Sequence, residues 1–136
     1  ESALLDRFHC FIEGWHLPRI DKSMIFKGWT INVEYFSEIL HSLRTQNQYS
    51  LLFDELVTFD PKADMRDFNA VKRITTAYMK LLFPHWITAE DVNSSDFDNY
   101  CLQPAIRRRG IIKEQCHNID AEFSNTKMPE IRVKTA

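Results

Sequence analysis

Arg66 is the side chain whose place in the sequence most strongly suggests a chemical role. Asp64 is a good N-cap for the helix that follows, so Arg66 falls in the first turn of that helix. A cation there opposes the helix dipole at a cost of about 0.3–1 kcal/mol, and a local rule broken in this way is a hint of function. The structural alternative, which the sequence alone favours, is that Asp64 or Asp67 neutralises the charge.

Three consecutive arginines, Arg107, Arg108 and Arg109, form a second candidate site. On a helix, three successive side chains spread over about 200° of the surface. Such a run is usually a solvated face of the helix. The alternative is a patch that binds the phosphates of a nucleic acid, and this remains a hypothesis.

The stretch from Leu51 to Glu55 matches the pattern of a Walker B strand, in which an aspartate organises Mg²⁺ and a glutamate polarises water. That chemistry needs a phosphate cradle of the form G-x-x-x-x-G-K-[ST], and none of the three glycines in the chain is so placed. We therefore interpret Asp54 and Glu55 as solvated acids of an amphipathic turn.

The sequence predicts neither a metal site nor a nucleophile. The five histidines are scattered, and the pairs His9–Cys10 and Cys116–His117 are adjacent, so the side chains of each pair point away from each other. No serine lies in a glycine-rich elbow of the kind that supports nucleophilic catalysis. The three cysteines lack C-x-x-C spacing, which favours reduced thiols in a cytosolic setting.

Composition limits the kind of protein further. The 136 residues predict one domain, and 44% hydrophobic with 26% charged residues is typical of a globular protein. Because the net charge is −2, any contact with nucleic acid would have to be local. No apolar run approaches the roughly 18 residues of a membrane span and no signal peptide is visible, so we expect a cytoplasmic protein without membrane contact. The start at Glu1 suggests a piece of a longer polypeptide.

The elements that must position these residues are mainly helices, because glycine is rare and Leu, Ile and Phe recur at helical spacing. Residues 31–46 predict an amphipathic helix. A second helix is predicted to start at the cap Asp64 and to stop at Phe83, because Pro84 disfavours helical backbone in the residue before it. The apolar stripe of this second helix comprises Val71, Ile74, Tyr78, Leu81 and Leu82.

Two further helix starts follow along the chain. Thr88 and Asp91 have the spacing of a capping box and predict a short helix. The last helix is predicted from about Pro104 through Ile119, since proline is favoured in a first turn.

Three segments are predicted to be non-helical or are left open. Residues 8–13 have the apolar composition of a buried strand. Residues 47–63 could hold a short helix or an extended stretch, and periodicity cannot decide between them. Residues 124–136 are polar and broken by proline, which predicts a linker or a disordered tail.

Four blocks of the sequence resemble, in order, the bacterial Lon-like AAA+ proteins of the BREX phage-defence type: "ALLDRFHCFIEGWHLPRI", "YFSEILHSLR", "RDFNAVKRITTAYMKLLFP" and "IRRRGIIKEQ". The resemblance covers nearly the whole chain. More distantly, "LLDRF" is similar to the arginine-finger segment of MCM helicases, and "MRDFNAVKRITTAYMKLLF" is similar to their sensor-2 helix. Two positions depart from these patterns: Glu13 stands where proline is expected, and His9 where MCM-like sequences carry an acid.

The resemblance implies roles for two arginines. Arg7 would be the arginine finger, which reaches across a ring interface to the ATP of the neighbouring subunit, and Arg66 the sensor-2 arginine, which reaches the nucleotide of its own subunit. The implied fold is a mainly α AAA+ lid subdomain with a short leftover N-terminal strand. Residues 1–20 would end the ATPase core, 21–123 would form the lid, and 124–136 the tail.

The whole protein would then be an oligomeric ATPase that uses ATP and Mg²⁺ and couples hydrolysis to proteolysis or to DNA remodelling in phage defence. This segment alone would bind neither cofactor and would be inactive. An alternative from another class is a helical module that binds nucleic acid or a protein partner, with the run Arg107–Arg109 as its support. A third is that the chain only packs subunits together.

Overall fold

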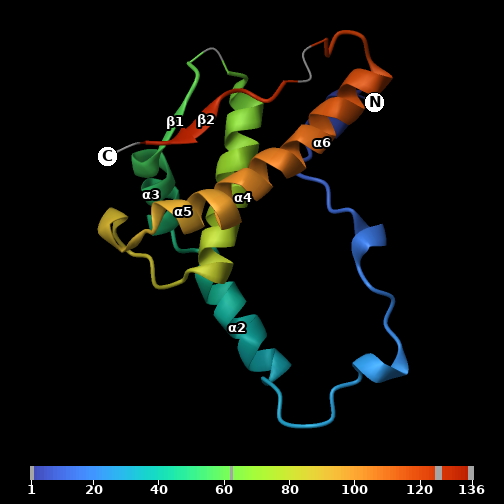
Figure 1. Cartoon of the computed structure of the whole chain (residues 1–136), viewed down its shortest axis with the longest axis vertical. Coiled ribbons are helices and arrows are strands. Elements are labelled where there is room, and N and C mark those ends of the chain that lie inside the picture. Colours follow the sequence, from blue (N-terminus) through green and yellow to red (C-terminus); the bar gives the residue numbers. More distant parts are fainter. Residues whose placement is uncertain (1, 62, 125–126, 135–136) are drawn as a thin grey trace. The chain divides into compact units, whose positions relative to one another are not determined.

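The computed structural model describes residues 2–61, 63–124 and 127–134, and it is mainly helical, as predicted (Figure 1). The α-helices are α1 (Ser2–Leu5), α2 (Val33–Arg44), α3 (Gln48–Leu56), α4 (Met65–Leu82), α5 (Ser94–Asp96) and α6 (Gln103–Ile119). Three-residue 3₁₀ turns lie at Gly14–His16, Lys22–Met24 and Ala89–Asp91, and a π-helical turn at Phe97–Leu102. The strands are β1 (Val57–Phe59) and β2 (Ile131–Val133).

The chain forms two compact units. Residues 1–11 pack together with residues 47–136 in what we call the larger unit, and residues 12–46 form the other. The boundaries at residues 20 and 123 come from the family resemblance and stay predictions.

The larger unit is built on α4, which packs against α3, the π-helical turn and α6. The buried residues of its main apolar cluster are Tyr49, Leu52, Phe53, Val57, Val71, Met79, Trp86, Phe97, Cys101, Leu102, Ala105 and Ile131. As predicted, Asp64 caps α4, since its carboxylate accepts a hydrogen bond from the backbone N–H of Arg66, and the helix ends at Leu82.

The predicted apolar stripe of α4 is only partly correct. Val71 is fully buried, but Leu81 and Leu82 are exposed. The row that faces the core includes the polar side chains of Asp67 and Thr75. A search for apolar periodicity overlooks these two positions.

The last helix, α6, has the predicted bounds to within one residue, but it continues a helical run that starts earlier in the chain. Asn93 caps α5 with hydrogen bonds from the backbone N–H groups of Ser95 and Asp96, and the π-helical turn connects α5 to α6 without a break. Pro104 is therefore the second residue of α6 and lies inside a longer helical run. Pro104 has no backbone N–H to donate, and the wider π-helical turn ends at Leu102, just before it. The capping box of Thr88 with the 3₁₀ turn after it is confirmed.

The strand predicted over residues 8–13 does not form, because a strand needs a neighbouring strand to satisfy its backbone and the described part of the chain supplies none there. Residues 8–13 have no regular secondary structure, and the element before them is the short helix α1.

The predicted tail, residues 124–136, contains a strand within the described residues 127–134, while residues 125–126 and 135–136 lie outside the described part of the chain. β2 pairs antiparallel with β1, with Val57 opposite Val133 and Phe59 opposite Ile131. Ile131 is buried in the core, and the burial of this apolar side chain stabilises the strand. In the described part of the open segment 47–63, the helix α3 is followed by the strand β1.

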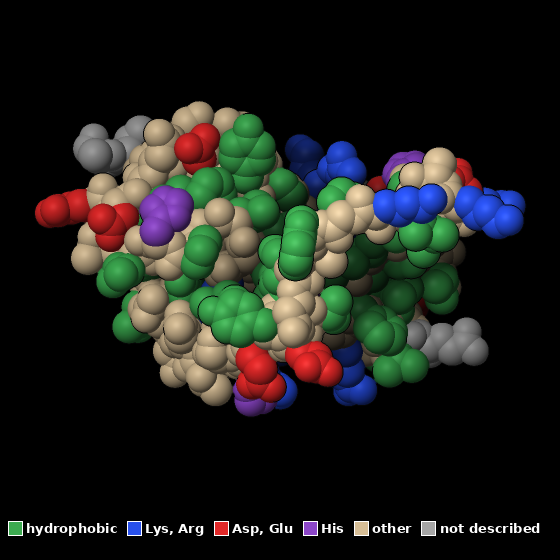
Figure 2. Space-filling view, turned by 90° about the horizontal axis from the view of Figure 1, so that it is seen from below, with side chains coloured by type: hydrophobic (Ala, Val, Ile, Leu, Met, Phe, Trp, Pro, Cys, Tyr) green, Lys and Arg blue, Asp and Glu red, His purple; other side chains and the backbone are tan. Residues whose placement is uncertain are grey.

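Residues 12–46 contain the predicted amphipathic helix, α2, capped by the side chain of Asn32. None of the residues in this unit is buried, and its apolar side chains, such as those of Trp29 and Phe36, remain exposed. Figure 2 shows such hydrophobic side chains at the molecular surface. The apolar face of α2 therefore has no core of its own to cover within this unit.

Among the residues that the structure describes, no helix combines the length and the hydrophobicity needed to cross a membrane.

Candidate functional site

The buried carboxylate of Asp6 lies at the centre of the candidate site. Asp6 follows directly after α1, and its side chain is 7% exposed. One oxygen accepts a hydrogen bond from Arg66 Nη1 at 2.5 Å, and the other accepts from Arg109 Nη2 at 2.6 Å. Burial alone would raise the pKa of Asp6, but the hydrogen bonds and charges of the two arginines outweigh burial and hold its pKa below the ordinary value. The site therefore contains an ionised carboxylate that joins two arginines distant in the sequence.

Arg109 is the most buried charged side chain of the described residues, at 1% exposure. Its Nε donates to Asp67 Oδ1 at 2.9 Å. Its Nη1 donates to two backbone carbonyls, of Asp6 at 2.9 Å and of Phe8 at 2.7 Å. A buried guanidinium is tolerated only when its donors are paired, and here each of its three nitrogens has an acceptor.

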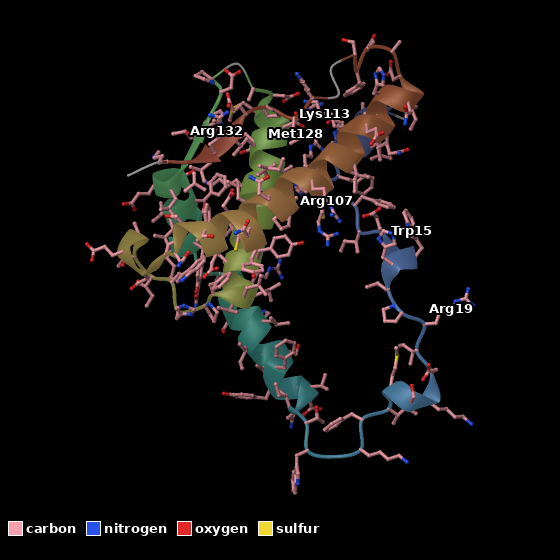
Figure 3. All side chains as sticks on the ribbon, in the orientation of Figure 1. Trp15, Arg19, Arg107, Lys113, Met128 and Arg132 are labelled. Atoms are coloured by element: carbon pink, nitrogen blue, oxygen red, sulfur yellow. The ribbon has the colours of Figure 1, made fainter. Side chains whose placement is uncertain are left out.

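Asp67 is the second acid that compensates the positive charge of Arg109. It lies in the first turn of α4, where the helix dipole favours an anion. Its second oxygen accepts from Lys113 Nζ at 2.5 Å. Figure 3 labels Lys113 on α6, the helix that also carries Arg109. Asp6, Arg66, Asp67, Arg109 and Lys113 thus form one network, which we call the Asp6 cluster.

Arg7, the predicted arginine finger, follows Asp6 directly and is exposed. Among the described residues, its guanidinium has no hydrogen-bond or ion-pair partner, whereas Arg109 donates to the backbone carbonyls of the residues before and after it, Asp6 and Phe8. The structure therefore combines a fixed backbone with a solvent-exposed cation at this position.

Arg66, the predicted sensor-2 residue, is 58% exposed. The acid that pairs with it is Asp6, and not the side chain of Asp64 or Asp67 as the structural alternative supposed. Asp64 instead accepts from the backbone N–H of Arg66, and Asp67 is occupied by Arg109. The Asp6 carboxylate consequently links Arg66 to the segment in which Arg7 is the next residue.

The run of three arginines is not one patch. Arg109 is buried and bound, so it cannot present its guanidinium to a nucleic-acid phosphate, and the hypothesis is corrected for this residue. Arg108 is half-buried and donates to Tyr78 Oη at 2.7 Å. Arg107 is exposed and lies on α6 in Figure 3.

The Walker B-like residues are helical, since Leu51–Glu55 belong to α3 and do not form a strand. Asp54 and Glu55 are exposed, as expected, and Asp54 pairs with Lys72 at 2.5 Å. Within the described ranges, no three His, Cys, Asp or Glu side chains are grouped so that they could hold a metal ion.

His9, which departs from the MCM-like pattern, lies beside the cluster and contacts Arg73. The His9 Nε2 to Arg73 Nη1 distance is 3.1 Å. Since arginine can only donate, His9 Nε2 is the acceptor. Partial burial of the ring, with the cations of Arg73 and Arg109, lowers the pKa of His9, which favours the neutral form.

Sequence reasoning missed Asp6 and the burial of Arg109, although one signal could have revealed the latter. Ala105, Arg109, Ile112 and Cys116 follow helical spacing, and all four are buried on α6. An arginine in register with apolar residues indicates a buried cation, which then requires buried acids.

The comparisons with known proteins agree on one family. A family model described as "Lon-like protease BrxL-like, ATPase domain" matches residues 1–129. The chain is 26% identical over 115 residues to the Lon-like protease BrxL of Escherichia coli O9:H4 (strain HS), and 27% identical over 120 residues to that of Bacillus cereus (strain H3081.97). These matches cover 85% and 88% of this chain but only 16% and 17% of the two relatives. The chain therefore belongs to the BrxL-like family of Lon-like proteins and lies within its ATPase domain.

Proposed function

We propose that this chain is the lid and sensor region of an ATP-hydrolysing Lon-like protein of the BREX phage-defence type. In this proposal Arg7 is the arginine finger, which acts on ATP held by a neighbouring subunit of a ring, and Arg66 is the sensor-2 arginine. The observation that carries the proposal is the Asp6 carboxylate, which joins Arg66 to the segment that bears Arg7. Asp6 thus connects the segments of two arginines that lie 59 positions apart in the sequence, which is what supports assigning them related roles.

The residues of the chain are better suited to supply positive charge to a nucleotide than to bind the nucleotide themselves. Arg7 is exposed, and the sequence has no glycine-rich phosphate cradle. The phosphates and Mg²⁺ would be held by residues outside this chain. Arg7 would supply positive charge to the γ-phosphate, where negative charge develops in the transition state of hydrolysis.

Arg66 is held by Asp6 in a way that a phosphate could compete with. The pair is formed by a largely exposed arginine and a buried carboxylate. Asp6 would keep its second partner, Arg109, when Arg66 turns away, so the carboxylate would not be left uncompensated. Release of Arg66 toward a nucleotide is therefore compatible with an intact cluster.

The proposal is tested by subunit mixing in the full-length protein. One variant carries Arg7→Ala, and the other carries an inactivated phosphate-binding loop. Each should lose hydrolysis alone, since an arginine finger contributes about 10³–10⁵ in kcat. Mixed rings should regain activity, because one subunit keeps the nucleotide site and the other keeps the finger.

The same mixing with Arg66→Ala tests the second assignment. If Arg66 acts on the nucleotide of its own subunit, mixing should restore nothing. Restoration would instead place Arg66 in trans, like Arg7. If Arg7→Ala hydrolyses ATP at the wild-type rate, the finger assignment is wrong.

A second candidate function, binding of nucleic acid, has one observation in its favour. Arg107 and Arg108 line an open hollow on the larger unit, together with Asn99, Gln103 and Pro104. Titration with duplex and single-stranded DNA at several salt concentrations tests it, since phosphate contacts weaken with salt. Binding that is absent, or that is unchanged in Arg107→Ala, would exclude this hollow as the contact surface.

A further inference from the structure

The segment that carries Arg7 is fixed from both sides by one side chain. Arg109 Nη1 donates to the carbonyl of Asp6 and to the carbonyl of Phe8, the residues directly before and after Arg7. The backbone N–H groups of Arg7 and Phe8 donate to the carbonyls of Leu4 and Leu5 at 3.1 and 3.0 Å. The main chain on either side of Arg7 is therefore hydrogen-bonded, while its side chain is exposed.

Arg109 can act as an anchor because its own guanidinium is buried and hydrogen-bonded on every nitrogen. It lies on α6, is almost fully buried, and has acceptors on Nε and Nη2 in Asp67 and Asp6. A planar guanidinium can serve carbonyls and carboxylates in several fixed directions at once, whereas a lysine ammonium on a flexible stem cannot. The position therefore specifically needs arginine.

We propose that Arg109 is a positioning residue for Arg7, which sets the direction in which the finger leaves the protein. The carboxylate of Asp6 accepts from both Arg109 and Arg66, and it thereby fixes the position of Arg66 relative to Arg7. This inference rests on the proposed function of Arg7. It assigns to a buried residue, which contacts no substrate, control over a reaction in which a displacement of about 1 Å can lower the rate about 100-fold.

The test is Arg109→Lys in the full-length protein, with two measurements. ATP hydrolysis should show a fall in kcat of about 100-fold with an unchanged KM, because the finger acts on the transition state and not on nucleotide binding. Hydrogen exchange at the amides of Arg7 and Phe8 should become faster, because their segment loses its anchor. Arg132→Lys is the matched control, since Arg132 is exposed on β2 and pairs with Glu130. It should change neither measurement.

A second variant covers the case in which Arg109→Lys fails to fold. Asp67→Asn keeps the shape of the side chain that accepts from Arg109 Nε and removes its charge. Asp67→Asn should weaken the hold on the Arg109 guanidinium. It should therefore lower kcat and speed up hydrogen exchange at Arg7 and Phe8, both by less than Arg109→Lys does. Circular dichroism spectra that match wild type identify the variants that are folded.

The outcomes separate this inference from the proposed function. If Arg7→Ala abolishes hydrolysis but folded Arg109→Lys or Asp67→Asn leaves kcat and exchange at wild-type values, the positioning role is overturned and the finger stands. If Arg7→Ala has no effect on hydrolysis, the proposed function fails, and the exchange at Arg7 and Phe8 still decides whether Arg109 fixes their segment. Faster exchange with an unchanged kcat would show an anchor without a role in the reaction and would overturn the inference.

Discussion

Asp6 is a buried anion whose charge the folded state needs, because Arg66 and Arg109 both donate to it. Burial disfavours the ionised form, but the two arginines outweigh burial, and the pKa of Asp6 lies below its ordinary value of 3.8. An acid with a depressed pKa binds its proton less tightly when folded than when unfolded. The stability it contributes is therefore present above the unfolded pKa and is lost as the pH falls through the folded pKa.

Asp6→Asn should remove this pH-dependent part of the stability. At pH 7 we expect a loss of about 3 kcal/mol, the lower end for a broken buried ion pair, because Arg109 keeps Asp67 and two carbonyls. Below about pH 4 the difference between variant and wild type should shrink. Urea unfolding of both proteins at several pH values measures this.

The control for this prediction is Asp54→Asn, because Asp54 is exposed and pairs with Lys72 at the surface. Exposed ion pairs contribute about 0–1 kcal/mol, so this variant should stay close to wild type at every pH. A loss for Asp6→Asn that is equally large at pH 7 and at pH 3 would show that its role is not electrostatic.

At this scale the sequence predicted the exposed residues better than the buried ones. Arg7 and Arg66 were identified as candidates from a family pattern and a helix cap. Asp6 was missed because its partners lie 60 and 103 positions away in the sequence, and no local pattern connects them. Which of three adjacent arginines is buried depends on the face that α6 turns to α4.

At the scale of elements, the pairing of β2 with β1 predicts that β2 contributes to the stability of the larger unit. Ile131 is 5% exposed and belongs to the core, although it lies in a segment that its composition predicts to be disordered. Ile131→Ala should destabilise the chain by about 2–3 kcal/mol through lost burial and the cavity left behind. Arg132→Ala, at the neighbouring exposed position, should cost less than about 0.5 kcal/mol. Equal stability of the two variants in thermal unfolding would show that β2 is not docked.

Elements with strong local signals were predicted and those that depend on distant partners were not. The caps and stops of α4 lie within its own sequence, and its bounds were correct to within about two residues. β2 is three residues long and pairs with residues more than 70 positions earlier, so its sequence alone contains too little information. The strand expected at 8–13 had the right composition, but composition does not supply a neighbouring strand.

The two units of the chain differ in what holds them together. The larger unit has a buried core, whereas residues 12–46 contain no buried side chain. Local opening costs little free energy where few side chains are buried, and a protease cuts at sites that open easily. The two units should therefore differ in their resistance to proteolysis.

Limited trypsin digestion of the chain should cut first after Arg19 and Lys27, both exposed within residues 12–46. Arg73 is the internal comparison, because it is also exposed but lies in the middle of α4, whose other face is buried. Cleavage after Arg73 requires the helix to leave the core, so it should follow only global unfolding and should speed up in Ile131→Ala. Mass spectrometry of the early fragments identifies the sites. Cleavage after Arg73 as early as after Arg19 would show that α4 opens as readily as residues 12–46, which would contradict the division of the chain into a packed unit and an unpacked one.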